Sequence, residues 1–256
     1  MDVKVVSLNI WHGELLDDVV AFLHAQDADI VLLQEVANAT DSALTRKHRS
    51  FSLLRQELGY EFADFAPALN INWPEGKVIE GNAIFSKFPI TTAHPPIFFN
   101  EPFGDMDYND PKHFPKAPRN LQHIEVKTPA GIVHILNLQG VWDLDGDNDS
   151  LKRRNMSRII LEQTKGLQRV IVAGDTNAKP TNPAMLALEE QLVSVFKDEL
   201  STSFNLRRKD LEKFPGYATA TVDLMYVSPD VKVVAHDCPN IDVSDHLPLT
   251  ATLTIS

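Results

Sequence analysis

A carboxylate and an amide, Asp175 and Asn177, stand two positions apart directly after the apolar run 170–173. Four apolar residues bounded by turn-forming residues predict a short buried strand. Loops that follow the strands of a rigid sheet often carry catalytic groups. Asp and Asn also favour ordinary turns, because their side chains bond the nearby backbone. The stretch alone therefore leaves a catalytic loop and a plain turn as open alternatives.

Other polar side chains end or interrupt apolar runs elsewhere in the chain. Glu35 ends the predicted strand 29–36, and Asp223 lies inside the apolar run 221–228. Carboxylates are rarely buried unless they are paired or bind a metal, although Glu35 could also end an exposed strand. The residues of this kind are Asn9, Glu35, Asp175, Asn177, Asp223, Asp245 and His246.

Hydrolysis of a phosphate ester would account for this combination of side chains. A carboxylate such as Glu35 suits Mg²⁺, which prefers oxygen ligands and keeps several waters. Such a metal offsets the charge that develops on phosphoryl oxygens. A carboxylate near an attacking water can act as a general base. A histidine supported by a carboxylate has its protonation fixed, and Asp223 is a candidate for that support.

Competing chemistries find little support in the sequence. It contains no Gly-x-Ser-x-Gly elbow and no P-loop. Cys238 is the only cysteine, which excludes a Cys-based zinc site and an intramolecular disulfide, and favours a reducing cytoplasm. The remaining histidines have no metal-ligand spacing and are interpreted as structural or exposed: His12, His24, His48, His94, His113, His123, His134 and His236.

The acidic stretch 143–149 has carboxylates at alternate positions, as a calcium loop does. Its glycine, however, is at the fourth position rather than the sixth, and Arg154 stands where a bidentate Glu is needed. A solvated acidic loop is therefore expected here.

The composition is that of a globular protein of 256 residues, with 43% hydrophobic residues and a net charge of −11. This charge argues against a broad basic surface for nucleic acid, but it allows a local basic groove or a metal that neutralises phosphate. No apolar run approaches the length of a membrane span, and no signal peptide is recognised. We expect a cytoplasmic monomer.

The elements that must position these residues are predicted from periodicity and turn signals. Helical spacing predicts helices over 14–26, 42–58, 150–165 and 183–191, with Ser150 as an N-cap. Residues 70–81 are turn-rich, and the prolines of 98–118 exclude a long helix or a central strand there. Strands are predicted over 3–8, 29–36, 61–65, 82–86, 119–127, 132–138, 170–173, 221–228, 231–235 and 250–255. These elements predict a single α+β domain, residues 1–256, with two strand layers and outer helices.

Six short motifs occur in a specific order along residues 3–253. They are Ser7-Leu8-Asn9-Ile10-Trp11, Leu33-Gln34-Glu35, Gly81-Asn82-Ala83-Ile84-Phe85-Ser86, Gly174-Asp175-Thr176-Asn177, Val222-Asp223-Leu224-Met225-Tyr226 and Ser244-Asp245-His246-Leu247-Pro248. In this order they resemble the endonuclease/exonuclease/phosphatase superfamily. That group includes deoxyribonuclease I, apurinic/apyrimidinic endonucleases, sphingomyelinases and inositol polyphosphate 5-phosphatases.

The resemblance implies a four-layer α/β/β/α sandwich, whose two central, mostly antiparallel sheets are flanked by helices. It also implies one Mg²⁺ or Mn²⁺ site. Glu35 matches the metal ligand, Asn9 the adjacent amide and Asp245 a second acidic residue of that site. Asp175 matches the carboxylate that activates water or handles the leaving group. Asn177 matches a phosphate-binding residue, His246 the catalytic histidine and Asp223 the carboxylate that orients it. The residues that match substrate-binding positions are Arg119, Gln139 and Asn82.

One position departs from the pattern of the superfamily. Many relatives have a histidine or tyrosine where this chain has Gln139. Glutamine carries no proton at neutral pH, but it can still hydrogen-bond a phosphate oxygen. If relatives use this position as an acid, this chain must use another group or favour an easier leaving group.

These observations favour a metal-dependent phosphoesterase of the nuclease type that hydrolyses a phosphodiester, with nucleic acid as a possible partner. The alternative is a phosphatase or phosphodiesterase that acts on a small-molecule or lipid head-group phosphate. A non-catalytic binding protein that retains the fold is a further alternative, because Gln139 lacks a proton to donate. The aromatic residues of 98–118 could form a lid or stack bases of a single strand.

Overall fold

The computed structural model describes residues 1–108, 110–143 and 148–256. Over these residues the strands form two seven-stranded sheets. The first, in the order β13-β14-β1-β2-β4-β3-β7, comprises β1 (Asp2–Asn9), β2 (Ile30–Ala37), β3 (Phe62–Trp73), β4 (Gly76–Ser86), β7 (Gly104–Met106), β13 (Lys232–Asp237) and β14 (Leu249–Thr254). The second, in the order β11-β12-β10-β9-β8-β5 with β6 on β8, comprises β5 (Ile90–Ala93), β6 (Ile97–Phe98), β8 (Asn120–Thr128), β9 (Gly131–Gln139), β10 (Val170–Asp175), β11 (Val193–Ser194) and β12 (Asp223–Val227).

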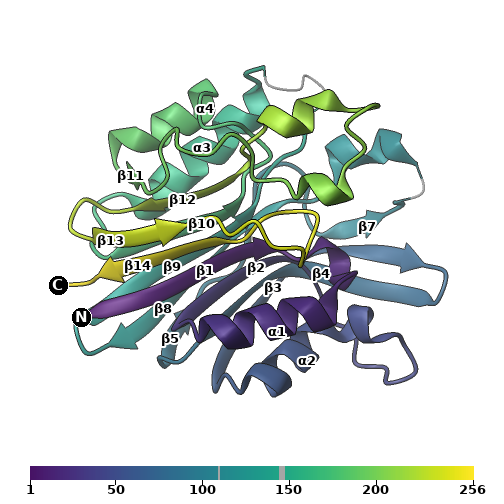
Figure 1. Ribbon diagram of the computed structural model, residues 1–256, viewed down its shortest axis with the longest axis horizontal. Coiled ribbons are helices and arrows are strands. Elements are labelled where there is room, and N and C mark those ends of the chain that lie inside the picture. Colours follow the sequence, from purple (N-terminus) through teal and green to yellow (C-terminus); the bar gives the residue numbers. More distant parts are fainter. Residues whose placement is uncertain (109, 144–147) are drawn as a thin grey trace.

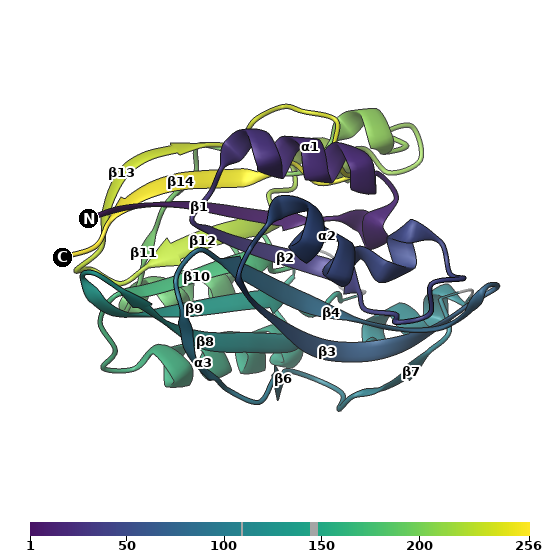
Figure 2. The same cartoon turned by 90° about the horizontal axis from the view of Figure 1, so that it is seen from below.

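Helices cover the outer faces of both sheets, which confirms the expected four-layer α/β/β/α sandwich (Figure 1). α1 (Leu16–Gln26) and α2 (Ser50–Leu58) lie on the first sheet, and α3 (Leu151–Thr164) and α4 (Pro183–Leu186) lie on the second (Figures 1 and 2). Short 3₁₀ helices are η1 (Trp11–Gly13), η2 (Arg46–Arg49), η3 (Pro111–Lys116), η4 (Ala187–Glu190), η5 (Leu206–Arg208) and η6 (Pro215–Thr219). No helix in the described residues is long and apolar enough to cross a membrane.

Most neighbouring strands are antiparallel, but parallel pairs place the strand ends that matter for the site. β1 runs parallel to β2, and β9 runs parallel to β10. The C-terminal ends of β1 and β2 therefore meet at one sheet edge, and those of β9 and β10 meet at one edge of the other sheet. β1 also pairs antiparallel with β14, so the two ends of the chain lie side by side.

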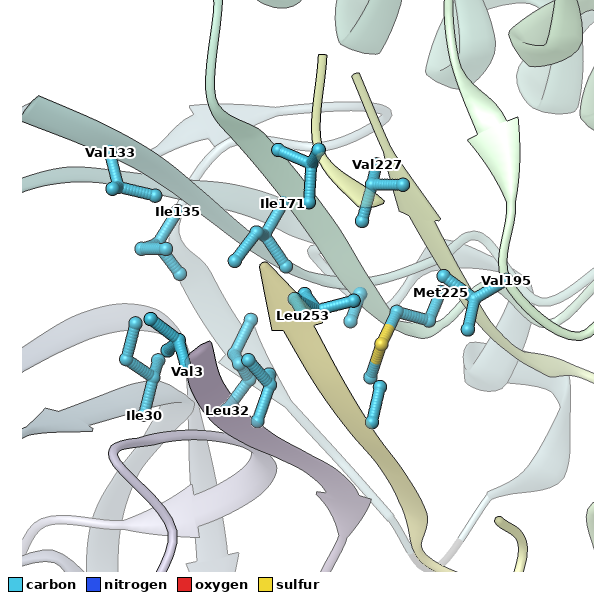
Figure 3. Close-up of a cluster of buried hydrophobic side chains, with 14 of the residues drawn as sticks. Val3, Ile30, Leu32, Val133, Ile135, Ile171, Val195, Met225, Val227 and Leu253 are labelled. Atoms are coloured by element: carbon cyan, nitrogen blue, oxygen red, sulfur yellow. The ribbon is translucent and has the colours of Figure 1, made fainter. Parts of the chain in front are cut away.

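The alternation of side chains along each strand builds the core between the sheets. Val3 and Val5 point into the space between the sheets, whereas Val6 and Leu8 pack under the helices of the outer layer. Side chains of both sheets, among them Val3 from the first and Ile171 from the second, meet in this central core (Figure 3). By the same alternation, Asn9 and Asp175 continue the inner faces of β1 and β10.

A layer of amide side chains follows this apolar core on the way to the site. Gln34 Nε2 donates to Asn137 Oδ1 at 2.7 Å, and Asn137 Nδ2 donates to the backbone oxygens of Leu33 and Ala83 at 3.0 Å. Buried polar groups are costly unless they are hydrogen-bonded, and here they bond across the two sheets. The amide layer therefore links the sheets directly beneath the strand ends.

The structure corrects two predicted elements, the turn-rich stretch and the start of the second helix. Residues 70–81 are not turn-rich, because β3 continues to Trp73 and β4 begins at Gly76. The apolar side chains of Leu69 and Ile71 alternate with Asn70, which is the period of a strand with one buried face. Helix α2 begins only at Ser50, after the 3₁₀ turn η2. The strand after residue 231, β13, pairs with β14 of the first sheet.

Candidate active site

Four strand ends and one loop meet at a single place between the sheets. Gln139, Asp175 and Asp223 lie side by side on β9, β10 and β12, because Asp175 is in register with both of the others. Asn9 ends β1 in the facing sheet. Ser244 holds the loop that carries His246 against this strand end, since its Oγ donates to the backbone oxygen of Asn9 at 2.6 Å. Residues distant in the sequence thereby reach one site.

Asn9 connects the two sheets through its side-chain amide. Its Nδ2 lies 3.1 Å from Glu35 Oε1 and 3.1 Å from Asp175 Oδ2. Its Oδ1 accepts a hydrogen bond from the backbone N–H of Trp11 at 3.0 Å. This bond orients the amide so that Nδ2 faces the two carboxyl groups. One buried amide therefore determines the spacing of the two carboxyl groups.

Glu35 reaches the site because β2 is irregular at this residue. Simple alternation would point Glu35 outward with Leu33, under the helices. The register with β4 shifts between Leu33 and Val36, and Glu35 has a φ of 57°. Such a β-bulge re-aims a side chain. Glu35 Oε1 consequently accepts Gln139 Nε2 at 2.7 Å as well as Asn9.

His12 is a site residue that the interpretation of the sequence missed. Its Nε2 lies 3.3 Å from Glu35 Oε2, and its Nδ1 lies 2.6 Å from Glu80 Oε2. Burial alone would lower the pKa of His12, but the two carboxylates outweigh it and raise the pKa to about 9. The available signal was its place directly after the motif that contains Asn9.

The neighbours of Glu35 keep this carboxyl group ionised. Burial by itself raises the pKa of Glu35, but the nearby positive charges of His12 and Arg119 lower it overall. The hydrogen bond from Asn9 acts in the same direction. An ionised, oxygen-donating side chain is what a hard divalent cation requires as a ligand.

Asp175 has the opposite shift. Burial is the main cause that raises its pKa to about 6, and the charge of Asp223 adds to it, while His246 opposes it. The backbone N–H of Asn177 donates to Asp175 Oδ1 at 2.9 Å. Gly174 permits this strand end, because a Cβ on this residue would lie 2.0 Å from the backbone oxygen of Leu138. Asp175 can thus exchange a proton near neutral pH.

His246 and Asp223 form the expected pair. His246 Nδ1 lies 2.8 Å from Asp223 Oδ2, which also accepts Ser203 Oγ at 2.6 Å. Burial lowers the pKa of His246, but Asp223, Asp245 and other nearby carboxylates outweigh it and raise it to about 10. His246 is therefore an imidazolium at neutral pH, and its cationic ring can face an anionic substrate.

Asp175, Asp223 and His246 each offer a ligand atom within 4.8 Å of the others, so a metal could be considered there. The Nδ1 of His246 is engaged by Asp223, however, and a protonated imidazole binds no metal. The carboxylate oxygens of Glu35 suit a hard cation better. Asp245, the other expected ligand, pairs with Lys209 Nζ at 2.6 Å through Oδ2.

Arg119 lies buried among the carboxylates at the centre of the site. Only 7% of the residue is exposed, and among the described residues no hydrogen-bond partner occurs for its Nε and one terminal nitrogen. Coulombic attraction by Tyr108, Glu35 and Asp175 exceeds the effect of burial, so its pKa is raised. A buried guanidinium with open donors is suited to bind a phosphate group.

The remaining expected residues lie at different depths. Asn177 Nδ2 donates to the backbone oxygen of Gly140 at 3.1 Å, at the rim beside Asp175. Asn82 Nδ2 donates to Asn120 Oδ1 at 2.9 Å, which places Asn82 in the amide layer beneath the site. The stretch proposed as an acidic loop, 143–149, lies partly outside the described residues, which omit 144–147.

The aromatic residues of 98–118 pack on the protein itself. The rings of Trp73 and Tyr108 stack with centroids 6.2 Å apart, and Phe114 contacts Tyr108 at 5.4 Å. These rings pack on a small apolar cluster around Met106 and the end of β3. Tyr108 and Trp73 also contact the ring of His12, so this closed aromatic cluster supports the Glu35 side of the site.

The sequence matches the Endonuclease/Exonuclease/phosphatase family over residues 6–246. No curated protein matches it in sequence. An endonuclease/exonuclease/phosphatase of Bacteroides vulgatus shares 19% identity, with a TM-score of 0.74 and 100% of both chains covered. A mannosyl-6-phosphatase of Bacteroides thetaiotaomicron shares 15% identity, with a TM-score of 0.66, over 98% of this chain and 99% of that one. D. rerio TDP2, complexed with a single-strand DNA product, shares 15% identity, with a TM-score of 0.68 and 99% of each chain covered.

Proposed function

The chain belongs to the endonuclease/exonuclease/phosphatase family, and from this premise we propose that it is a divalent-metal-dependent phosphoesterase that hydrolyses a phosphodiester. The observation that carries the proposal is the contrast across Asn9. This amide holds an ionised Glu35 and a titratable Asp175 in one buried site. Two carboxyl groups with opposite pKa shifts are a recurring sign of divided roles in catalysis.

Glu35, Asn9 and Asp245 are the residues that would hold Mg²⁺ or Mn²⁺. The carboxylate oxygens of Glu35 and Asp245 fit a hard cation, and Glu35 is already ionised. Asn9 presents Nδ2 to Glu35 and Oδ1 to the Trp11 N–H, so its amide would have to turn over to offer its oxygen to the metal. When bound, the metal would neutralise charge on the phosphoryl oxygens. Lys209 neutralises Asp245 in this structure, so metal binding there would compete with an existing ion pair.

The other residues would position the substrate and move protons. Asp175, with a pKa near neutrality, accepts a proton from the attacking water. His246, held through Nδ1 by Asp223, donates a hydrogen bond from Nε2 to the phosphoryl group and stabilises its negative charge. Arg119 supplies a buried cation for a phosphate oxygen.

Gln139 limits how the leaving group can be protonated. Its Nε2 donates to Glu35, and its side chain carries no titratable proton. Asp175 and the Asp223–His246 pair are therefore the groups assigned to acid–base work. A nuclease-type activity on a phosphodiester is the function we favour, and D. rerio TDP2 with its single-strand DNA product is consistent with it.

A phosphatase that acts on a small-molecule phosphate is the second candidate. The net charge of −11 favours a small substrate over a long polyanion. The structural likeness to a mannosyl-6-phosphatase is consistent with this alternative.

One assay separates these functions. The protein is incubated with bis-p-nitrophenyl phosphate, p-nitrophenyl phosphate, single-stranded oligonucleotides and plasmid DNA, with Mg²⁺, with Mn²⁺ or after EDTA. We expect diester cleavage that EDTA abolishes and added Mg²⁺ or Mn²⁺ restores. Faster cleavage of the monoester would favour the phosphatase, and turnover that persists without metal would refute the proposal.

A further inference from the structure

A groove opens directly beside the catalytic residues. It has a volume of about 420 Å³, and its lining includes Asn177 and Phe204. Asn177 contacts Asp175, and the ring of Phe204 lies 4.6 Å from the ring of His246. A molecule in this groove would therefore touch the same two residues that flank the site.

Four aromatic side chains line this aromatic groove: Trp142, Phe204, Phe214 and Tyr217. Phe204 contacts Tyr217 with centroids 4.7 Å apart, and Tyr217 contacts Phe214 at 5.9 Å. Trp142 and Phe214 are nevertheless 37% and 50% exposed. Exposed aromatic surface gathered in one concave place marks a binding site more often than chance exposure does.

The closed aromatic cluster at Trp73 and Tyr108 provides an internal contrast. There the rings stack on one another and on a local apolar core, and Trp73, Tyr108 and Phe114 are partly buried. In the aromatic groove, Phe214 is 50% exposed, with Lys213 Nζ over its ring, 5.1 Å from the centroid. The two flanks therefore differ in degree, because the clustered rings are partly buried whereas Trp142 and Phe214 are exposed.

Positive charge accompanies the open rings. Among the described residues that line the groove, Arg153, Lys179 and Lys213 are cations and Asp143 is the one carboxylate. This local excess of cations contrasts with the net charge of −11 for the whole chain. Arg153 also supports the groove, because one of its terminal nitrogens donates to the backbone oxygen of Asn177 at 3.0 Å. An anionic group next to a planar ring matches this surface.

We infer that the aromatic groove binds one nucleotide unit, with its base on the open faces of Trp142 and Phe214 and its phosphate toward Asn177. The groove has the volume of a small-ligand site rather than that of a duplex track. Stacking of a base on an aromatic side chain is insensitive to sequence, since every base has a π face. A sugar phosphate lacks such a face. The inference rests on the proposed function and specifies its substrate class.

The first test compares two diesters that share a leaving group. One is a nucleoside 5′-(p-nitrophenyl phosphate), and the other is methyl p-nitrophenyl phosphate, which has no base. We expect kcat/KM to be higher for the nucleoside ester by roughly 5- to 100-fold. Phe214→Ala should remove most of this preference, and Phe214→Trp should retain it. Phe103→Ala is the matched control, because Phe103 is 42% exposed and lies outside the groove.

A second arm identifies the source of the nucleotide. A dinucleotide is compared with a single-stranded ten-mer that has the same terminal bases. A higher kcat/KM for the dinucleotide indicates a free small nucleotide, and a higher value for the ten-mer indicates a strand end.

A direct binding measurement tests whether the groove binds a nucleotide independently of whether the protein hydrolyses a phosphodiester. Calorimetry on the intact protein compares a nucleoside monophosphate with ribose 5-phosphate. Tighter binding of the nucleotide, lost in Phe214→Ala and kept in Phe103→Ala, supports the groove even if no diester is hydrolysed. Equal binding of both compounds, together with diester hydrolysis that ignores the base, would overturn the inference and leave the phosphoesterase proposal intact.

Discussion

Glu35 and Asp175 accept hydrogen bonds from the same Asn9 amide, yet their pKa values shift in opposite directions. Asp175 is buried and Glu35 is partly buried, and desolvation raises both pKa values. Positive charges on His12 and Arg119 outweigh burial at Glu35. At Asp175 the positive charge of His246 opposes burial without outweighing it, and the negative charge of Asp223 adds to burial. Neighbouring charges thus decide which carboxyl stays ionised.

The comparison also separates the contributions of the two sheets. The edge of the first sheet supplies a permanently ionised carboxylate, which suits a metal ligand. The edge of the second sheet supplies a titratable carboxyl, Asp175, and Asp223, which pairs with His246 from the loop before β14 of the first sheet; these groups suit proton transfer. Because the site lies between two sheets, Glu35 and Asp175 have different charged neighbours, although both accept a hydrogen bond from the amide of Asn9.

The largest expected effect comes from removing the titratable carboxyl. Asp175→Asn should lower kcat on bis-p-nitrophenyl phosphate by roughly 10²- to 10⁴-fold, because the variant lacks a general base. Initial rates measure this effect, and circular dichroism checks the fold. The exposed variant Asp18→Asn serves as the control and should behave as the native protein does. A rate within threefold of the native value (roughly 0.65 kcal/mol) would mean that Asp175 has been assigned the wrong role.

The same substitution should stabilise the metal-free protein at neutral pH. Folding raises the pKa of Asp175 from 3.8 to about 6, so the native state loses stability as the pH rises through this window. Asparagine has no charge to bury. Asp175→Asn should therefore increase the free energy of unfolding by roughly 2–3 kcal/mol at pH 8, and by little below pH 3.8. Urea unfolding in EDTA at several pH values measures this difference, and a gain that does not depend on pH would contradict it.

A smaller effect is expected on the metal side. Glu35→Gln should raise the Mg²⁺ or Mn²⁺ concentration for half-maximal activity by about tenfold or more, because an amide is a weaker ligand than a carboxylate. Metal titrations of activity and calorimetry of metal binding test this expectation together. Unchanged metal affinity in both would place the metal away from Glu35. Glu61→Gln, on the surface, is the control.

The smallest expected effect concerns the support of the histidine pair. Ser203→Ala removes the hydroxyl that lies 2.6 Å from Asp223 Oδ2. The loss of a hydrogen bond to a buried charged group should lower the free energy of unfolding by about 1–2 kcal/mol. Thermal unfolding of Ser203→Ala beside the exposed Ser52→Ala measures it. If both variants were equally stable, Asp223 would be held adequately by His246 and the backbone.

Alternation and motif order were sufficient to predict several members of the site. Asn9 and Asp175 continue the inner faces of strands that the apolar pattern predicted, so their place between the sheets follows from a period of two. The Asp223–His246 contact was expected from the family pattern and is present at 2.8 Å. Catalytic and metal-binding roles for these residues stay predictions that the variants above test.

Other features of the site could not be predicted from the sequence. The β-bulge at Glu35 depends on its pairing with β4, and alternation alone would have turned Glu35 under the helices. His12 was interpreted as structural or exposed, because no local spacing relates it to Glu80, 68 positions away. The hairpin of β3 and β4 was taken for turns, since its asparagines are turn formers by composition.

The sequence by itself determined the layered fold, the family and the types of the chemical groups. These follow from short-range periodicity and from the order of motifs along the chain. Only the tertiary structure decided which groups are charged and which surfaces are open. The charge states of Glu35 and Asp175 depend on neighbours from other strands, and the open rings of Phe214 and Trp142 depend on what packs against them. Electrostatic and packing energies depend on distances in space, and those distances exist only after the two sheets have come together.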